Sequence, residues 1–261
     1  MSIVDIANGE SGSSVRGKLN EVKDIAVESQ SIEDISPQTV NVYDSFQRAN
    51  GAVGNADSGQ TPVILSGAGG EIVDKQLFLS TGGGASNPTF PFIIAWPLST
   101  ITSIQATGSF KIKTQFSFAL GGSLIIAKDA TNYIEIEFYS LIRVRSCIAG
   151  ATSILYTSSA IATITGSTQY LNQLFSVTLI LSRANQSTSP VDPYLRVSIS
   201  EIPELNFLLD TAFFQADIAT LFPLGTDVAY FGFGQIGNSY TNTRFMKANY
   251  LKVNDHYNFL A

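Results

Sequence analysis

The stretch Asp44–Gly59, DSFQRANGAVGNADSG, divides the chain into two parts of different character. It places one large apolar side chain, Phe46, among residues that favour turns. Asn, Asp and Gly adopt tight and left-handed backbone conformations more readily than other residues. We therefore predict an ordered loop in which Phe46 packs into a hydrophobic core. The residues before it are expected to form a lead-in, and those after it one all-β domain, 43–261.

Runs of β-branched and aromatic residues alternate with Gly-rich turns throughout the second part. In 133–139, apolar residues alternate with Glu135 and Glu137, and 195–200 repeats such a pattern. This period of two predicts an antiparallel sandwich with one buried and one solvated face per sheet. Strands are expected at 62–66, 71–79, 91–96, 108–120, 122–128, 132–139, 142–148, 153–157, 170–182, 194–202, 228–234 and 243–253. For 206–222 helix and strand patterns both fit, and a short helix or crossover loop is expected.

The first part, 1–42, is expected to hold an extended arm, one amphipathic helix over 14–28 and a polar linker in which Pro37 prevents any helix. The apolar stripe of the helix consists of Val15, Leu19, Val22 and Ala26. An isolated helix of this length is marginal in water. The stripe must therefore pack against something, either the chain's own β domain or copies of itself.

Two stretches resemble segments of phage proteins. The order D-x-F-x-R-A-x-G followed by G-N-A-D-S-G, within Asp44–Gly59, resembles the opening of concanavalin-like jelly-roll domains in phage tail and fibre proteins. The stretch Gly9–Asn20, GESGSSVRGKLN, is similar to a segment of phage fibre-like proteins that forms a trimeric module. The strand that begins at Asn132 is similar to strands of laminin-G-like and concanavalin-like sheets. A fold of this kind carries many functions, so the function needs its own argument.

These resemblances imply an antiparallel β-sandwich of the concanavalin-like jelly-roll type, preceded by a short helix and an arm. They also imply a virion protein that forms a homotrimer through Val15, Leu19, Val22 and Ala26. Its N-terminal segment would contact other virion proteins.

The composition limits the partners of the protein. Charged residues make up 14% of the chain, against about 25% in an average globular domain. Such a polar, weakly charged surface suits extracellular and virion proteins. The net charge of −6 argues against nucleic acid, because phosphate binding needs a positive surface. No apolar run approaches the roughly 20 residues of a membrane helix, and the N-terminus does not resemble a secretory signal. We expect no membrane insertion.

Catalytic chemistry is restricted by the scarcity of nucleophiles and bases. Cys147 and His256 are the only residues of their types. A Ser-His-Asp triad would have to use His256, and neither a thiolate site nor a multi-histidine metal site can be built. Glycosidases need two carboxylates across a cleft, and Glu135 and Glu137 share one strand face. Because a third acidic residue and flanking aromatic subsites are missing, we interpret this pair as a solvated strand face. We predict no enzyme, no cofactor and a buried Cys147.

Oxygen ligands for calcium are available in Asp44, Asp129, Asn132 and Asp192, but acidic loop residues more often form turns. No metal site is predicted. The candidates for stacking on a sugar ring are Trp96, Tyr156, Tyr194 and Tyr240, although a lone Trp in a sandwich more often lies in the core.

The sequence therefore favours a trimeric tail fibre or receptor-binding protein whose sandwich binds a host surface polysaccharide. A capsid decoration or head-fibre protein that stabilises the shell, and a polysaccharide hydrolase, remain alternatives.

Overall fold

The structure is a computed structural model that describes residues 40–67, 70–80, 92–99, 104–111, 113–115, 118–120, 122–138, 141–159, 174–182, 193–223, 228–235 and 245–255. The chain divides into two units at Thr39–Val40, and every described residue belongs to the second unit. The predicted arm, helix 14–28 and most of the linker lie outside the described residues. The first described strand begins at Val40, and the β domain was expected to begin near Val40 or Tyr43.

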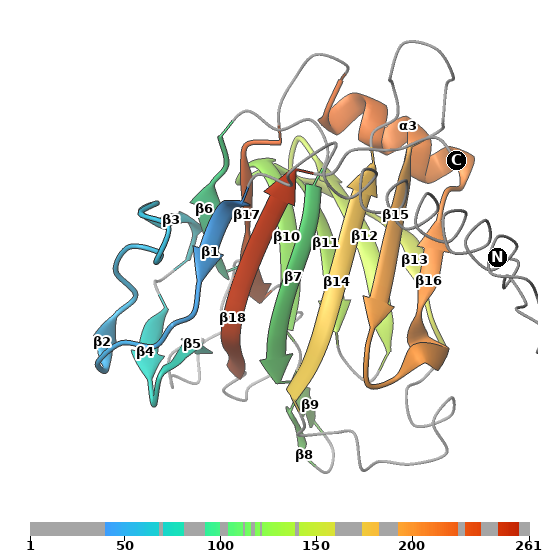
Figure 1. Ribbon diagram of the computed structural model, residues 1–261. Helices are drawn as coiled ribbons and strands as arrows, with labels where there is room; N and C mark the ends of the chain where they lie inside the picture. The colour runs from blue at the N-terminus through green and yellow to red at the C-terminus, as the bar shows by residue number, and fades with distance from the viewer. Residues whose placement is uncertain are drawn as a thin grey trace, which may run out of the picture. The chain divides into compact units, whose positions relative to one another are not determined.

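Antiparallel strands form most of the described domain (Figure 1). The elements are β1 (Val40–Asp44), β2 (Gly51–Ala52), β3 (Val63–Ser66), β4 (Glu71–Val73), β5 (Gln76–Ser80), β6 (Phe92–Pro97), β7 (Ile104–Lys111), β8 (Lys113–Gln115), β9 (Phe118–Leu120), β10 (Gly122–Asp129), β11 (Asn132–Phe138), β12 (Ile142–Ile148), β13 (Ala151–Thr157), β14 (Leu174–Ser182), β15 (Tyr194–Ile199), η1 (Pro203–Leu205), β16 (Phe207–Leu209), α3 (Ala212–Leu221), β17 (Tyr230–Gln235) and β18 (Phe245–Asp255).

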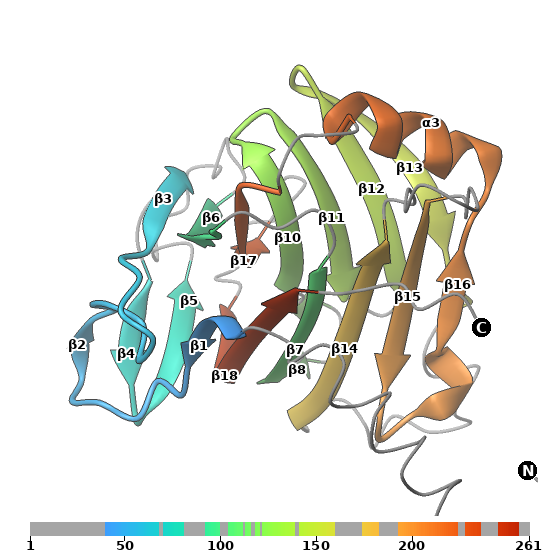
Figure 2. The same cartoon turned by 45° about the horizontal axis from the view of Figure 1, so that its top comes forward.

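Two sheets face each other. The nine-stranded sheet, called sheet A below, has the order β16-β15-β14-β7-β18-β5-β4-β2, with β1 paired to β18. The seven-stranded sheet, called sheet B, has the order β13-β12-β11-β10-β17-β6-β3. Figure 2 shows the two layers with β10–β13 of sheet B behind β14–β16 of sheet A. Many neighbours in each sheet are far apart in sequence, as in β7 and β18. The predicted all-β, antiparallel jelly-roll sandwich is confirmed.

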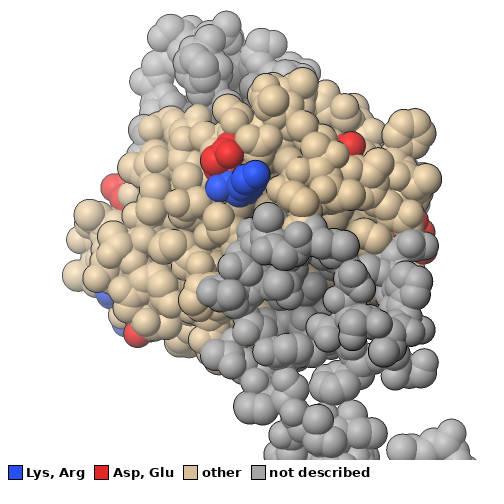
Figure 3. Space-filling view, turned by 90° about the horizontal axis from the view of Figure 1, so that it is seen from above, with Lys and Arg blue, Asp and Glu red and all other residues tan. Residues whose placement is uncertain are grey.

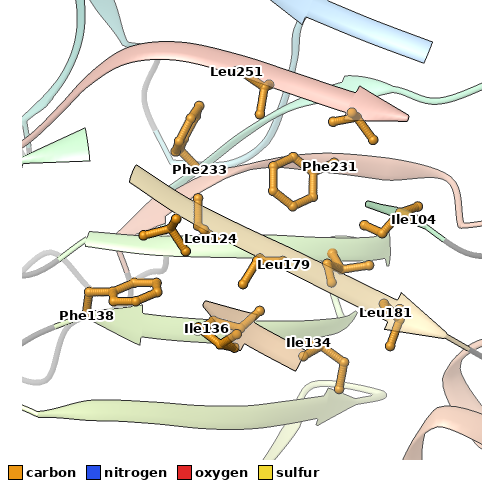
Figure 4. Packing of buried hydrophobic residues seen from close by; sticks show 14 of the residues in the cluster. Ile104, Leu124, Ile134, Ile136, Phe138, Leu179, Leu181, Phe231, Phe233 and Leu251 are labelled. Carbon is orange, nitrogen blue, oxygen red and sulfur yellow. The ribbon is translucent and has the colours of Figure 1, made fainter. Parts of the chain in front are cut away.

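The core fills the space between the two sheets. Ile134 and Ile136 of β11 point toward sheet A, and Leu179 and Leu181 of β14 point toward sheet B (Figure 4). These side chains are 0% exposed. The alternation predicted from the sequence therefore holds for β11, whose intervening glutamates lie on the other face of sheet B. It holds for β15 as well, since Leu195, Val197 and Ile199 are buried there.

The opening loop places Phe46 in this core, which confirms the prediction. The ring of Phe46 lies 6.0 Å from that of Trp96 and 6.3 Å from that of Phe233, measured between centroids. Trp96 and Phe233 themselves meet edge to face at 6.1 Å. Phe46 has a φ of 55°, a left-handed conformation that is uncommon for an aromatic residue. Three aromatic rings from the loop, β6 and β17 thus fix the start of the domain.

Polar contacts hold the backbone of the loop around Phe46. Asp44 Oδ1 accepts a hydrogen bond from the backbone N–H of Phe46 at 2.8 Å and another from Arg48. Arg48 Nη1 donates to the backbone oxygens of Val53, at 2.8 Å, and Asn55. The Arg48 guanidinium therefore donates hydrogen bonds to one carboxylate and two backbone carbonyl oxygens. Asp44 is fully buried, and this burial raises the pKa of its carboxyl even though the Phe46 and Arg48 bonds lower it.

One edge of the sandwich is joined by an aromatic pair. Tyr156 of β13, the edge strand of sheet B, stacks on Phe207 of β16, the edge strand of sheet A, with centroids 4.2 Å apart. Helix α3 lies nearby at one end of the sandwich (Figures 1 and 2). Its buried Phe214 and Ile218 extend the core, and Asp217 accepts a hydrogen bond from Ser146 of β12. The short helix expected in 206–222 is confirmed.

Some strand boundaries differ from the predictions. The expected strand 71–79 is a hairpin of β4 and β5 that turns at Asp74 and Lys75, whose φ values are 52° and 60°. The turn lacks the glycine that usually marks such positions, so no break was predicted there. The expected strand 108–120 is divided into β7, β8 and β9.

Candidate functional site

The face of sheet B that points away from the core carries a cluster of charged residues. Because side chains alternate along a strand, the neighbours of core residues Ile134, Ile136 and Val144 lie on this outer face. The group that we call the charged cluster consists of Ser123 from β10, Glu135 and Glu137 from β11, and Arg143 and Arg145 from β12. One hairpin register pairs Glu135 with Arg145 and Glu137 with Arg143. Ser123 lies opposite Glu137 on the other side of β11.

Hydrogen bonds connect all five members of the charged cluster. Arg145 Nη1 donates to Glu135 Oε2 at 3.1 Å, and Arg145 Nη2 donates to Glu137 Oε2 at 2.8 Å. Arg143 Nη1 donates to the same oxygen of Glu137 at 3.3 Å. Ser123 Oγ donates to Glu135 Oε1 at 2.5 Å. The two carboxylates are therefore held from both sides, and none of these side chains needs to rotate to find a partner.

Burial changes the acidity of Glu135. Its side chain is 1% exposed, and this loss of solvent raises the pKa of the carboxyl to about 7, although Arg145 and Ser123 act in the opposite direction. The nearby Glu137 adds to the upward shift. The carboxyl of Glu135 therefore titrates close to neutral pH. A carboxyl of this kind, next to a second carboxylate, is the arrangement from which acid–base catalysts are built.

Solvent reaches the charged cluster at one end only. Side-chain exposure is 27% for Arg143, 14% for Arg145, 10% for Glu137 and 1% for Glu135. Arg143 lies opposite Thr157 of β13, and Arg145 lies opposite Ile154, which is 62% exposed. The accessible part of the charged cluster is thus the Arg143 end, beside the edge strand β13.

Next to the charged cluster, the outer face carries a buried apolar cluster. It contains Ile93, Ala95, Ile125, Ala127, Tyr133 and Cys147, against which Leu65 and Tyr230 pack. Strand β17 contributes Gly232 and Gly234 opposite Ile125 and Ser123. A Cβ at Gly232 would lie 2.1 Å from the backbone oxygen of Ile94, so only glycine allows β6 to approach here. Cys147 is buried, as predicted.

The structure corrects the interpretation of the glutamate pair. Glu135 and Glu137 do share one strand face, but that face is not solvated: both residues are buried and paired with arginines. The sequence contains the signal that was missed. Arg143-Val-Arg145 follows Glu135-Ile-Glu137 at a spacing that a hairpin brings into register, and opposite charges facing each other across strands stabilise a sheet.

The aromatic residues predicted to contact sugars are not brought together. Trp96 is fully buried in the core, so the prediction that its ring stacks on a sugar is wrong for this structure. Tyr156 is half-buried and stacks on Phe207, whereas Tyr194 is a half-buried residue of sheet A. Tyr240 lies outside the described residues, as do Val15, Leu19, Val22 and Ala26.

The acidic loop residues that were considered as calcium ligands have other contacts. Asp44 binds Arg48, and Asp129 accepts hydrogen bonds from Thr131 and Asn132. Asp192 lies outside the described residues. Within the described ranges, no group of three or more His, Cys, Asp or Glu side chains is placed to hold a metal ion. In the same ranges, no helix is long and apolar enough to cross a membrane.

Charged side chains are also sparse on the face of the molecule that Figure 3 shows. Seen from above, the described part of the molecule shows few charged side chains: basic and acidic groups lie together near the centre of the view, and others lie toward its edges (Figure 3). Because charged residues form only 14% of the chain, the two arginines and two glutamates on adjacent strands of sheet B are a notable concentration of charge.

Comparison with known proteins identifies the fold. The sequence matches no protein-family model and no curated protein. The alginate lyase Aly36B, solved with an alginate tetrasaccharide, has a TM-score of 0.53 and 11% identity, over 84% of this chain and 98% of that chain. A structure from work on endo-acting O-glycanases that human gut microbiota express to initiate mucin breakdown has a TM-score of 0.50 and 8% identity, over 84% of this chain and 100% of that chain. The GH43 protein BlXynB from Bacillus licheniformis also has a TM-score of 0.50, with 13% identity, over 82% of this chain and 39% of that chain. At such identities the likeness concerns the β-sandwich fold alone.

Proposed function

We propose that this protein is a structural component of a phage virion and that its β-sandwich binds a saccharide of the host surface at the accessible Arg143 end of the charged cluster, beside strand β13. The observation that carries the saccharide part is the charged cluster, whose Arg143 end is accessible. A site for a polyhydroxylated ligand needs a few polar groups in fixed positions. Mutual hydrogen bonds among Glu137, Arg143 and Arg145 fix these groups before any ligand arrives, so little conformational entropy is lost on binding.

The virion part of the proposal is supported by the sequence. The opening loop and Gly9–Asn20 each resemble segments of phage fibre proteins, and charged residues form only 14% of the chain. Within this proposal, the N-terminal segment attaches the protein to the particle and assembles a homotrimer. The sandwich is then displayed three times, and weak single contacts with a repetitive surface polysaccharide add up through avidity.

A binding experiment tests this function. The labelled full-length protein is incubated with a panel of bacterial strains and, separately, with phage particles that lack it. We expect binding to some strains, competition by the purified surface polysaccharide of the same strain, and weaker binding by Glu137→Gln. The control Arg196→Met changes an exposed residue of sheet A and should bind as the unchanged protein does. Binding to particles alone, with no strain bound, would contradict the proposal and indicate a capsid decoration protein.

One observation favours a second candidate, a polysaccharide hydrolase. Glu135, with its pKa near 7, and Glu137 lie side by side on β11 and share Arg145. Both carboxylates are occupied by strong partners, however, and Glu135 is almost inaccessible, which favours binding over hydrolysis. Measurement of reducing ends released from the bound polysaccharide separates the two functions. Release that disappears in both Glu135→Gln and Glu137→Gln would establish the hydrolase.

A further inference from the structure

We infer that the ligand of this face is an acidic saccharide whose carboxylate pairs with Arg143, an inference that rests on the proposed saccharide-binding function. The two arginines of the charged cluster differ in how far their hydrogen-bonding capacity is used. Arg145 holds two carboxylates, one with each terminal nitrogen. Among the described residues, Arg143 makes a single long bond, from Nη1 to Glu137 Oε2 at 3.3 Å.

The guanidinium of Arg143 therefore has N–H donors that are not used within the charged cluster. An arginine carries five N–H donors in a planar fork. Within the described part of the chain, the buried Nε of Arg143 has no hydrogen-bond partner. This N–H is closed to solvent, so the donors that a ligand can reach are those in the exposed part of the side chain, which is 27% exposed overall. A carboxylate fits a guanidinium edge with two parallel hydrogen bonds, whereas a single hydroxyl accepts only one.

The charges of the cluster favour an anion at the same position. Glu137 already accepts from both arginines through one oxygen, Oε2, so its negative charge is shared. Glu135 is the other carboxyl, and burial keeps its pKa near 7, so its charge is incomplete at neutral pH. The two arginines of the charged cluster therefore carry more positive charge than its two glutamates carry negative charge. The surplus lies at the exposed end, because Arg143 is farther from Glu135 in the register than Arg145 is.

The neighbouring edge strand leaves room for this anion. Strand β13, which pairs with β12, has the sequence ATSILYT and no acidic or basic residue. Its only ionisable group, Tyr156, points to the core and packs on Phe207. Thr152, Ile154 and Thr157, which lie opposite Cys147, Arg145 and Arg143, are exposed. Strand β13 therefore neither repels a carboxylate by charge nor neutralises Arg143, and its hydroxyls offer additional hydrogen bonds to a sugar.

The test compares each acidic saccharide with its own neutral derivative. Oligogalacturonate, hyaluronan oligosaccharides and oligosialic acid are titrated into the full-length protein, each beside its carboxyl-reduced form, together with neutral maltohexaose and laminarihexaose. We expect at least one acidic form to bind about tenfold or more tightly than its reduced form, as a charged hydrogen bond would give. This comparison needs no variant and does not depend on how a substitution folds.

Variants then assign the effect to Arg143. Arg143→Met should remove the preference for the acidic form, Arg143→Lys should keep part of it, and Arg196→Met should keep all of it. Equal binding of acidic and reduced forms, or a preference that survives in Arg143→Met, would overturn the inference and leave the proposed function in place. Binding to the neutral saccharides alone would likewise overturn the inference of an acidic ligand and leave the proposed saccharide-binding function unchanged. Absence of binding to every saccharide and every bacterial strain would overturn both.

Discussion

Arg145 joins Glu135 and Glu137, which are two residues apart on β11, by donating one hydrogen bond to each at 3.1 Å and 2.8 Å. Two carboxylates on one face of a strand normally repel each other, and burying them costs solvation free energy. Here the guanidinium of Arg145 bonds both carboxylates, Arg143 donates a further hydrogen bond to Glu137, and Ser123 donates one to Glu135. The outer face of sheet B can therefore hold buried charge, and the geometry of the charged cluster has consequences that can be measured.

The stability of the protein should depend on the proton of Glu135. Its pKa in the folded protein is about 7, above the ordinary value of 4.5, so the folded state binds this proton more tightly than the unfolded state does. The contribution of this proton to the free energy of unfolding is fully present below pH 4.5 and is lost as the pH rises through 7. The loss is on the order of 3 kcal/mol. Glu135→Gln should flatten this decline in the free energy of unfolding, measured with denaturant between pH 5 and 8. The exposed control Glu204→Gln should keep it, and an equal decline in both variants would refute the assignment.

The opening loop should depend on the pair formed by Asp44 and Arg48. Asp44 is fully buried, and its Oδ2 has no hydrogen-bond partner among the described residues. Arg48→Met removes the neighbouring cation and should lower the free energy of unfolding at pH 8 by about 3–5 kcal/mol. The loss should shrink at lower pH, because burial raises the pKa of Asp44 and removal of Arg48 raises it further. The double variant Asp44→Asn/Arg48→Met should recover part of the stability. A double variant less stable than Arg48→Met would contradict this account.

The stacked rings of Tyr156 and Phe207 should couple the edges of the two sheets. Their centroids are 4.2 Å apart and their planes differ by 16°. A double-mutant cycle of Tyr156→Leu and Phe207→Leu should give a coupling energy of about 0.5–1.5 kcal/mol. As a control, Tyr156→Leu combined with Phe213→Leu should be additive, because Phe213 is 82% exposed. Additivity in both cycles would show that the stack adds nothing beyond burial.

The predicted helix 14–28 should supply the trimer contact. Leu19→Asp places a charge in the apolar stripe and should reduce the assembly from three chains to one, each of 28.0 kDa, in light scattering after size exclusion. The control Lys23→Asp introduces the same residue outside the stripe and should leave the mass unchanged. If the Leu19→Asp variant remains trimeric, as the control should, the trimer interface lies outside this apolar stripe.

Features that depend on short-range patterns could be predicted from the sequence. The isolated Phe46 among turn formers indicated a residue that packs into the core, and the period of two in 133–139 indicated which residues face sheet A. The same alternation identified the shared face of Glu135 and Glu137. These predictions succeeded because side-chain direction in a strand is set by the backbone and needs no knowledge of the partner strand.

Features that depend on pairing between strands were missed or wrong. Alternation assigns polar residues to solvent by default, so the burial of Glu135 could not be recognised without the register that brings Arg145 opposite it. The burial of Trp96 could not be recognised because its ring partner Phe233 lies on the neighbouring strand β17 of sheet B, more than 130 residues later in the sequence. The turn at Asp74 and Lys75 was missed because neither residue is a glycine.

Hydrogen–deuterium exchange of the full-length protein, with and without the surface polysaccharide that competes for cell binding, tests the central claim most directly. We expect slower exchange on binding in peptides that cover β12 and β13, within 141–159, and unchanged exchange in β14 and β15 of sheet A. Protection confined to sheet A, or no change in 141–159 when the polysaccharide is bound, would contradict the claim that the outer face of sheet B is the binding face.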